Sequence, residues 1–380
     1  MRNGQIITKA LRICITLMAA MIATSILPTA VFAAEETTIK TATETTVTDE
    51  SKKDESNGDV SEGTPEEPEP PATTEGWLQN EDGSISYILN GNKLTGFQKI
   101  EDNYYFFNAE GVMQKGLQTV EGKKRYFSEE DGKMVKSKLV TIEKYQYYFD
   151  AEGVMVKGTT AKIGSAYYLF STTGKRYTTT GLKTVGNDKY YVISKTGKVS
   201  TKGWQAVVVK SGKKQYKRAY YCTPKSGVIA KKGTKIGYVK IPSKGYLGEA
   251  YYYGVKTLDK NGWSLKSAFN YSKKLKYYGR SYRTKYVETY ALRGFKTKKG
   301  NCYVMAATFN VQAKLLGYDV KQVYGKVDLP HSWTEVKHNG KTYVYDPNFT
   351  NETGRNGYKI YYGKKGTWRY HKLGNVKYSY

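Results

Sequence analysis

Cysteine and histidine are scarce in this chain, with three of each in 380 residues. Cys14 lies in a hydrophobic N-terminal stretch, so only two cysteines remain if that stretch is a cleaved leader. Two cysteines cannot build a disulfide framework, and we expect Cys222 and Cys302 to be free thiols. No His, Cys and Asp residues have the spacing of metal ligands, so we expect no metal and no cofactor.

Long hydrophobic runs are equally scarce. The one substantial run, Ile13 to Phe32, follows three basic residues and ends at the small-residue site Val31-Phe32-Ala33. This arrangement is typical of a secretory signal peptide, which we place at residues 1–33. Because no second run of spanning length occurs, we expect a secreted protein with no membrane span after the signal is removed.

Acidic residues are concentrated in one segment and are few elsewhere. Residues 35–75 hold 13 of the 34 Asp and Glu but only 3 of the 61 Lys and Arg, with almost no large apolar side chain. Such a segment cannot bury a core, so residues 34–75 are predicted to be an acidic disordered linker. Residues 76–380 then carry a formal net charge of +34. That charge suits a polyanion, and for a secreted protein we expect a cell-wall polymer and no nucleic acid. A basic surface that only keeps a tyrosine-rich chain soluble explains the charge equally well.

Glycine, in contrast, recurs with a fixed period between residues 76 and 231. Units of 20 to 23 residues open at Gly76, Gly96, Gly116, Ser137, Gly158, Gly181 and Gly203. Within each unit an aromatic cluster such as Tyr104-Tyr105-Phe106-Phe107 precedes a glycine turn. A fixed period of this length indicates a repeat architecture. Each unit has the pattern of one β-hairpin, which cannot bury its aromatic face alone, so the units are predicted to stack as a solenoid.

The repeated pattern is Gly-aromatic, then Tyr-Tyr-Phe, then Gly-x-Met. It resembles the cell-wall-binding, or choline-binding, repeats of Gram-positive surface proteins. The resemblance implies noncovalent retention at the bacterial wall through teichoic acid, choline or another glycan. In choline-binding members, rings from adjacent repeats cage a quaternary ammonium. Only two tryptophans occupy the opening aromatic position here, so choline is not favoured over another polymer. The candidate wall-ligand residues are Trp77, Phe97, Tyr104, Tyr105, Tyr147, Tyr148 and Trp204.

The repeat period fails after Gly233, and residues 234–380 have the pattern of a separate domain. Ser264 is a candidate cap for one helix, and a second helix is predicted from Cys302 to a stop at Gly317. Strands are predicted at 318–327, 331–336 and 341–345, with a hairpin turn at Asn339-Gly340. Helices on an antiparallel sheet give an α+β domain.

Cys302 is placed for thiol chemistry because it opens a helix after Gly300 and Asn301. Free N–H groups and the positive end of the helix dipole favour a thiolate. If Asn339-Gly340 is a two-residue loop, Trp333 faces Asp346 and His331 faces Asn348, all on one sheet face. Asp346 is then diagonal to His331, roughly 7–8 Å away between backbones. Either Asp346 or Asn348 can therefore orient the imidazole.

The order Gly-Asn-Cys, then His-Ser-Trp, then Tyr-Asp-Pro resembles the transglutaminase-like superfamily, a papain-like thiol fold. The resemblance covers about residues 258–350. It implies that Cys302 is the nucleophile, His331 the general base and acid, and Asp346 the residue that orients His331. An acyl-enzyme would form on an amide and pass to water or to an amine. Trp333 and Trp263 are candidate substrate-binding residues, although Trp333 fits a core position equally well.

Together these patterns predict a multidomain protein, with a β-hairpin solenoid before an α+β transglutaminase-like domain. The favoured function is a secreted, wall-associated thiol enzyme that acts on peptide or protein amides. The alternative is a non-catalytic wall-binding adhesin that retains the fold. The presence of Cys302, His331 and Asp346 in this order favours the enzyme. A lysin that cleaves glycan with paired carboxylates is disfavoured, because the basic domain has few acids.

Overall fold

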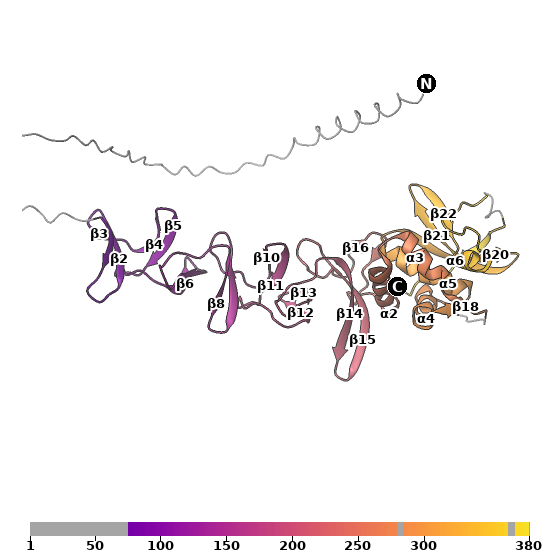
Figure 1. Ribbon diagram of the computed structural model, residues 1–380, viewed down its shortest axis with the longest axis horizontal. Coiled ribbons are helices and arrows are strands. Elements are labelled where there is room, and N and C mark those ends of the chain that lie inside the picture. The colour runs from indigo at the N-terminus through magenta and orange to yellow at the C-terminus, as the bar shows by residue number, and fades with distance from the viewer. Residues whose placement is uncertain (1–74, 280–283, 364–368, 380) are drawn as a thin grey trace, which may run out of the picture. The chain divides into compact units, whose positions relative to one another are not determined.

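A computed structural model describes residues 75–279, 284–363 and 369–379. The predicted signal peptide and all but the last residue of the predicted linker lie outside these residues. In the part of the chain that is described, no helix is long and apolar enough to cross a membrane. Figure 1 shows β-hairpins from indigo to pink, and then the helices and strands of an α+β region in orange and yellow.

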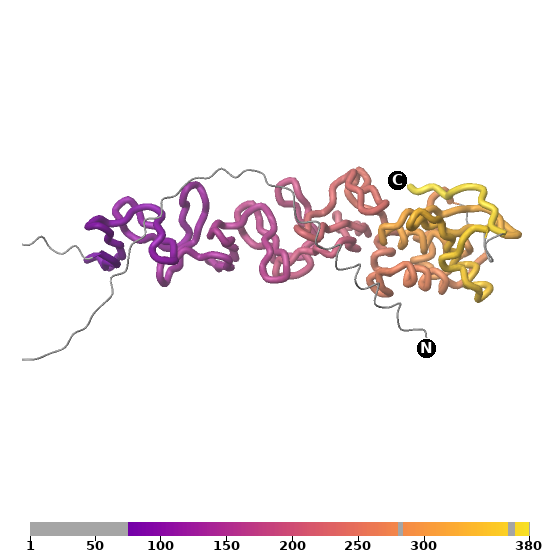
Figure 2. The backbone as a smooth tube through the Cα atoms, turned by 90° about the horizontal axis from the view of Figure 1, so that it is seen from above, coloured from indigo at the N-terminus to yellow at the C-terminus, as the bar shows by residue number. Residues whose placement is uncertain are grey.

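The first part consists of seven antiparallel hairpin units, numbered here in chain order. Their strands are β1 (Gly76–Gln79), β2 (Ile85–Leu89) and β3 (Asn92–Lys93), β4 (Gly96–Ile100) and β5 (Asn103–Phe107), β6 (Gly116–Val120) and β7 (Lys123–Phe127), β8 (Lys138–Ile142) and β9 (Tyr145–Phe149), β10 (Thr160–Ile163) and β11 (Ala166–Leu169), β12 (Gly181–Val185) and β13 (Asp188–Val192), and β14 (Gly203–Ser211) and β15 (Lys214–Cys222). The predicted hairpin repeat is confirmed, and the backbone forms successive loops in Figure 2.

The residue that opens a unit has a left-handed backbone. Gly96 and Gly116 have φ of 74° and 73°. Ser137, which replaces glycine at the opening of unit 4, has φ of 49°. The degenerate unit therefore keeps the local geometry of its neighbours, at the steric cost that a Cβ brings in this region.

Each unit is joined to the preceding one by a backbone hydrogen bond from the segment after its hairpin. The donor and acceptor pairs are Met113 to Ile85, Met134 to Tyr104, Met155 to Lys124, Arg176 to Gln146, Val199 to Tyr167 and Ile229 to Lys189, at 2.7–2.9 Å. Ring contacts follow the same order, as where Phe106 of unit 2 stacks on Phe127 of unit 3 with centroids 6.0 Å apart. The array is therefore held together by contacts between neighbours, as the solenoid prediction requires.

The second part is an α+β region. Its elements are β16 (Lys235–Ile236), β17 (Val239–Lys240), α2 (Glu249–Asn261), α3 (Leu265–Lys273), β18 (Lys276–Tyr277), α4 (Val287–Thr297), β19 (Lys299–Gly300), α5 (Cys302–Leu315), β20 (Asp319–Val327), β21 (Leu329–His338), β22 (Lys341–Tyr345), α6 (Pro347–Thr353) and β23 (His371–Asn375). The main sheet has the antiparallel order β22-β21-β20-β23, and α5 packs on β20 and β21. The predicted α+β class is confirmed.

Three helices, α2, α4 and α6, were not predicted. α4 lies in a basic, tyrosine-rich stretch that has the composition of a connector. Its buried residues, Val287, Tyr290, Ala291 and Gly294, nevertheless recur at helical spacing, and they pack on α5. The polar tyrosine hydroxyls and the interior glycine hide this apolar stripe from a pattern search.

The last hairpin unit shares its core with the α+β region. Trp204 and Ala219 belong to the same buried cluster as residues of α2 and α5. Ala219 also exchanges two backbone hydrogen bonds with Leu247, at 3.0 and 2.9 Å. The boundary predicted between residues 231 and 234 therefore falls inside a continuous core.

Glycine at the turn of unit 4 is expected to be required for packing as well as for conformation. Gly153 has φ of 71°, and a Cβ there would lie 2.7 Å from the Met134 sulfur of unit 3. Gly122 has φ of 72°, and nothing lies within 4 Å of its Cβ position. We expect Gly122→Ala to cost about 1–2 kcal/mol for its φ alone. Gly153→Ala should cost roughly 1–3 kcal/mol more from overpacking.

Thermal unfolding of the two variants, followed by circular dichroism, measures this difference. Equal melting temperatures would contradict the role of the Met134 contact.

Candidate active site

Cys302 is the first residue of α5. The Asn301 side chain caps this helix by accepting a hydrogen bond from the Val304 amide at 3.3 Å. Gly300 is not among the residues with positive φ. A Cβ on Gly300 would instead collide with the Val304 side chain. The glycine is therefore needed for close approach, and it lets the chain enter the helix with the thiol at the helix start.

Two side chains of the sheet form hydrogen bonds with the first turns of α5. Gln322 on β20 donates from Nε2 to the Tyr303 carbonyl at 2.9 Å. Thr334 on β21 donates from Oγ1 to the Ala306 carbonyl at 3.0 Å. Both polar side chains are fully buried. The thiol-bearing end of the helix is therefore fixed against the strand that carries His331.

His331 and Asp346 are in direct contact, with His331 Nε2 2.6 Å from Asp346 Oδ2. The hairpin register agrees with the prediction as far as Thr334 opposite Tyr345. β22 ends there, and Asp346 becomes the N-cap of α6. The expected pairs of Trp333 with Asp346 and of His331 with Asn348 therefore do not form.

Between the two candidate orienters, the structure places Asp346 on the imidazole. Asn348 is buried, and its Nδ2 has no hydrogen-bond partner among the described residues.

The Asp346 carboxylate is fully buried and accepts hydrogen bonds from further donors. Its Oδ1 accepts from the Phe349 amide at 2.9 Å, and its Oδ2 accepts from the Tyr370 hydroxyl at 2.7 Å. Burial, together with the Asp346 charge, raises the pKa of Tyr370, so the phenol stays protonated as a donor. Tyr370 was not predicted, because it lies far along the chain with no motif around it.

His331 is held as an imidazolium. Burial by itself lowers the pKa of His331, but the Asp346 carboxylate, followed by the Cys302 thiol, raises it to about 10. Contact with Cys302 includes a side-chain hydrogen bond. Since Nε2 faces Asp346, Nδ1 is the nitrogen left for the thiol. A positive imidazolium beside a cysteine at a helix start stabilises the thiolate form.

The two tryptophans predicted to bind substrate lie elsewhere. Trp333 is fully buried, donates to the Tyr362 hydroxyl at 2.6 Å and stacks beside His331 with centroids 6.3 Å apart. It supports the imidazole from the core, so direct substrate contact by Trp333 does not agree with the structure.

Trp263 is 40% exposed, but it lines a cavity with Trp204, Tyr221 and Gly317. That cavity lies at the C-terminal end of α5, roughly 20 Å along the helix from Cys302. The predicted role of Trp263 in the thiol cleft therefore does not agree with its position.

Two tyrosines that were not predicted lie beside the thiol. Burial raises the pKa of Tyr303, and the Cys302 charge adds to the rise. Burial also raises the pKa of Tyr277, with contributions from Glu352 and then Cys302. Tyr277 pairs with Gly300 across β18 and β19 and is 45% exposed. Tyr277 therefore presents an exposed ring close to the thiol.

Cys222 differs from Cys302 in every respect that matters for reactivity. Both are free, as expected. Cys222 is fully buried in unit 7, and burial raises its pKa to about 12. Cys302 is half-buried at the helix start. Among the residues that the structure describes, no group of three His, Cys, Asp or Glu side chains is arranged to hold a metal.

The aromatic residues predicted to bind a wall ligand fall into two groups. Trp77 is 49% exposed, and its ring lies on Tyr105 of unit 2 with centroids 4.8 Å apart. Tyr105 itself is buried, as is Trp204 in the core shared with α2. Direct ligand contact by Tyr105 and Trp204 therefore does not agree with the structure.

The remaining four residues of this set are partly accessible. Phe97 stacks on Tyr104 within unit 2, with centroids 5.2 Å apart. Tyr147 and Tyr148 are half-buried, and Tyr148 stacks on Phe170 of unit 5. These rings join neighbouring strands or units, and they keep part of their surface in solvent.

Comparison with known families gives two matches in chain order. Residues 94–139 and 137–180 match the choline-binding repeat, and residues 258–347 match the transglutaminase-like superfamily. The chain thus carries choline-binding repeats followed by a transglutaminase-like domain, and it is a cell-wall-associated protein.

Individual relatives match this chain over short stretches. Glucosyltransferase-I of Streptococcus downei is 37% identical over 62 residues, which is 16% of this chain and 4% of that protein. Glucosyltransferase-S of Streptococcus mutans is 30% identical over 69 residues, or 17% of this chain and 5% of that protein. The chain therefore spans about one-twentieth of the length of these curated relatives.

Solved structures are similar over a larger share of the chain. Choline binding protein F of Streptococcus pneumoniae is 25% identical, with a TM-score of 0.32, over 46% of this chain and 57% of that one. A modular autolysin of the same species is 20% identical, with a TM-score of 0.30, over 43% and 35% of the two chains.

Iodoacetamide alkylation is expected to distinguish the two thiols. The pKa of His331 is raised to about 10, so its imidazolium places a positive charge beside Cys302 across the neutral range. We expect Cys302 to react nearly as fast at pH 6.5 as at pH 8.5, whereas an ordinary thiol with a pKa of about 8.5 slows about 50-fold over that range. His331→Ala should restore the ordinary dependence.

Mass spectrometry of the labelled peptides measures both sites in one sample, and buried Cys222 serves as the unreactive internal control. Equal rates for Cys302 with and without His331 would contradict the ion pair.

The pKa of His331 is expected to shift in opposite directions when Asp346 and its donor Tyr370 are substituted. Asp346→Asn removes the carboxylate charge and should lower the pKa of His331 by about 1–3 pH units. Tyr370→Phe removes one donor from that carboxylate, strengthens its hold on the imidazolium and should raise the pKa. NMR titration measures both, since only three histidines contribute signals. An unchanged value in Asp346→Asn would be incompatible with the observed contact.

Proposed function

We propose that this protein is a secreted, wall-associated thiol enzyme that forms an acyl-enzyme on peptide or protein amides. One observation carries the proposal, namely the buried Asp346 carboxylate held against His331, which in turn meets the Cys302 thiol at a helix start. Nucleophile, base and orienting acid in this order are the minimum that thiol acyl transfer needs.

The first half of the reaction follows from these contacts. The Cys302 thiolate attacks the amide carbonyl carbon and forms a C–S bond, and the carbonyl oxygen takes the displaced electron pair. The Cys302 amide at the start of α5 is free to donate to that oxygen, because the first turn of a helix provides no acceptor for it. The C–N bond then breaks, and the leaving nitrogen takes the proton of the His331 imidazolium. The product is a thioester on Cys302.

The second half returns the enzyme to its starting state. Water or a primary amine attacks the thioester carbon and gives its proton to His331, and the C–S bond breaks to release the Cys302 thiolate. Attack by water gives hydrolysis, and attack by an amine gives a new amide crosslink. The residues at the thiol are compatible with both outcomes.

The repeats supply the location of this chemistry. We propose that partly exposed rings of the array, such as Trp77 and Tyr148, contact a wall polymer and keep the enzyme near its substrates. Wall peptides and neighbouring surface proteins are then the amides within reach. A non-catalytic adhesin would use the same array without the thiol.

Activity is expected to depend on Cys302 alone among the cysteines. Purified Gram-positive cell walls with a fluorescent primary amine provide both substrates, and ammonia release without amine incorporation reports hydrolysis. We expect Cys302→Ala to lower turnover more than about 10³-fold, as loss of a catalytic nucleophile does. Cys222→Ala is the matched control and should retain turnover.

Co-sedimentation of the same variants with the walls separates attachment from catalysis, because both should sediment like the wild type. Wall binding without turnover in the wild type would reject the enzyme in favour of the adhesin.

A further inference from the structure

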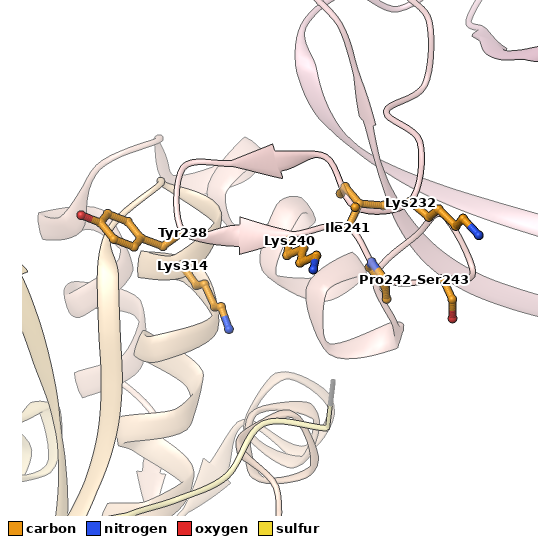
Figure 3. A pocket seen from close by; sticks show the side chains of 8 residues that line it. Lys232, Tyr238, Lys240, Ile241, Pro242, Ser243 and Lys314 are labelled. Atoms are coloured by element: carbon orange, nitrogen blue, oxygen red, sulfur yellow. The ribbon is translucent and has the colours of Figure 1, made fainter.

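A second cavity lies at the opposite end of α5 from the thiol. It has a volume of about 550 Å³ and is formed by the hairpin β16–β17, the segment that follows it, and the last turn of α5. Its lining side chains include Lys232, Tyr238, Lys240, Ile241, Ser243 and Lys314 (Figure 3). None of these residues belongs to the thiol site.

The charge in this cavity is of one sign. Three lysines from three parts of the chain line it, and no Asp or Glu does. Figure 3 shows the Lys240 and Lys314 side chains reaching into the same space, with Lys232 and Ser243 at the other end. Residues 232–380 as a whole contain 29 Lys and Arg against 8 Asp and Glu. An anion in this space therefore meets attraction with little competing negative charge.

The cavity walls are held by backbone contacts, so the site is preformed. The Gly233 amide donates to the Ile241 carbonyl at 2.8 Å, and the Ile241 amide donates to the Thr234 carbonyl at 2.9 Å. The hairpin turn is pressed against the end of α5, since a Cβ on Gly237 would lie 2.7 Å from the Gly317 Cα. A ligand does not have to order this part of the chain before binding.

Lys314 lies in a partly buried position, where its charged form is less well solvated than in water. Its Nζ lies 3.5 Å from the centroid of the Tyr378 ring. Burial lowers its pKa to about 8, against the opposing effects of Glu288 and Asp319. A lysine ammonium kept in a partly buried place is a frequent mark of a functional site. A bound anion offsets the desolvation of such a group.

The repeats, in contrast, already use cations of the chain on several of their aromatic rings. The Arg125 guanidinium lies 4.9 Å from the Phe97 ring centroid, and Lys136 Nζ lies 4.7 Å from that of Tyr104. Lys175 Nζ lies 3.6 Å from the centroid of Tyr145. These ring faces hold internal ammonium and guanidinium groups where a quaternary ammonium would otherwise stack. These contacts favour recognition of a negatively charged ligand over recognition of choline at these rings.

We propose that the lysine cavity beside β16–β17 binds a phosphodiester group of an anionic wall polymer. All three cations are lysines, which bind phosphate groups as point charges. Pro242 and the exposed Tyr238 ring offer apolar surface to the carbon links between phosphates. The site extends the attachment proposed for the repeats and does not depend on thiol activity.

The full mature chain with Lys240→Met and Lys314→Met tests this proposal. The matched control carries Lys337→Met and Lys341→Met, which remove the same charge from exposed positions outside the cavity. Calorimetric titration with synthetic poly(glycerol phosphate) should show a dissociation constant raised about tenfold or more in the cavity variant. The control should change about twofold or less, as expected for distant screened charges.

Three results would overturn the proposal. The first is an equal loss in the control, which would indicate general charge attraction. The second is undiminished binding in the cavity variant. The third is equal affinity for polyglutamate, or displacement by choline chloride, either of which would exclude a phosphodiester site.

Circular dichroism monitors folding of each variant. If the Lys314 change unfolds the domain, Lys232→Met with Lys240→Met tests the same cavity with two exposed lysines. Thiol alkylation, measured on the same samples, separates failure of this proposal from failure of the enzyme proposal.

Discussion

The arrangement of Cys302, His331 and Asp346 depends on one buried carboxylate. Asp346 has lost all contact with solvent, and it is stable there because an imidazole nitrogen, a backbone amide and a phenol donate to it. This carboxylate faces the imidazole and is the main group that raises the pKa of His331. The position and charge of His331 therefore follow from this single group.

The repeats depend on a different constraint, because no unit is stable alone. A hairpin of two five-residue strands leaves its aromatic face exposed to solvent until the next unit covers it. The backbone hydrogen bond between consecutive units fixes the register of that cover, and glycine turns such as Gly153 leave room for the preceding methionine. The array is therefore a chain of local contacts, and the α+β region ends it with a large core.

Local patterns predicted much of this structure, and the errors came from contacts distant in sequence. Periodicity located the seven hairpins, and the Asn339-Gly340 turn gave the register that brings His331 and Asp346 together. The register could not reveal that β22 stops at Tyr345, because that stop depends on α6 and its cap. Tyr370 could not be predicted for the same reason, because only the folded sheet brings it close to Asp346. Burial of Trp204 and Trp333 likewise depends on which surfaces the domain covers.

The core shared by the last hairpin and α2 has a consequence for how such proteins can be recombined. A gene fusion or a protease cut at residue 232 would separate Trp204 and Ala219 from their partners and expose an apolar face of the α+β region. The portable module therefore begins at about residue 203, with its final hairpin included. An exchange of arrays between proteins of this type would preserve folding only if it occurred upstream of that hairpin.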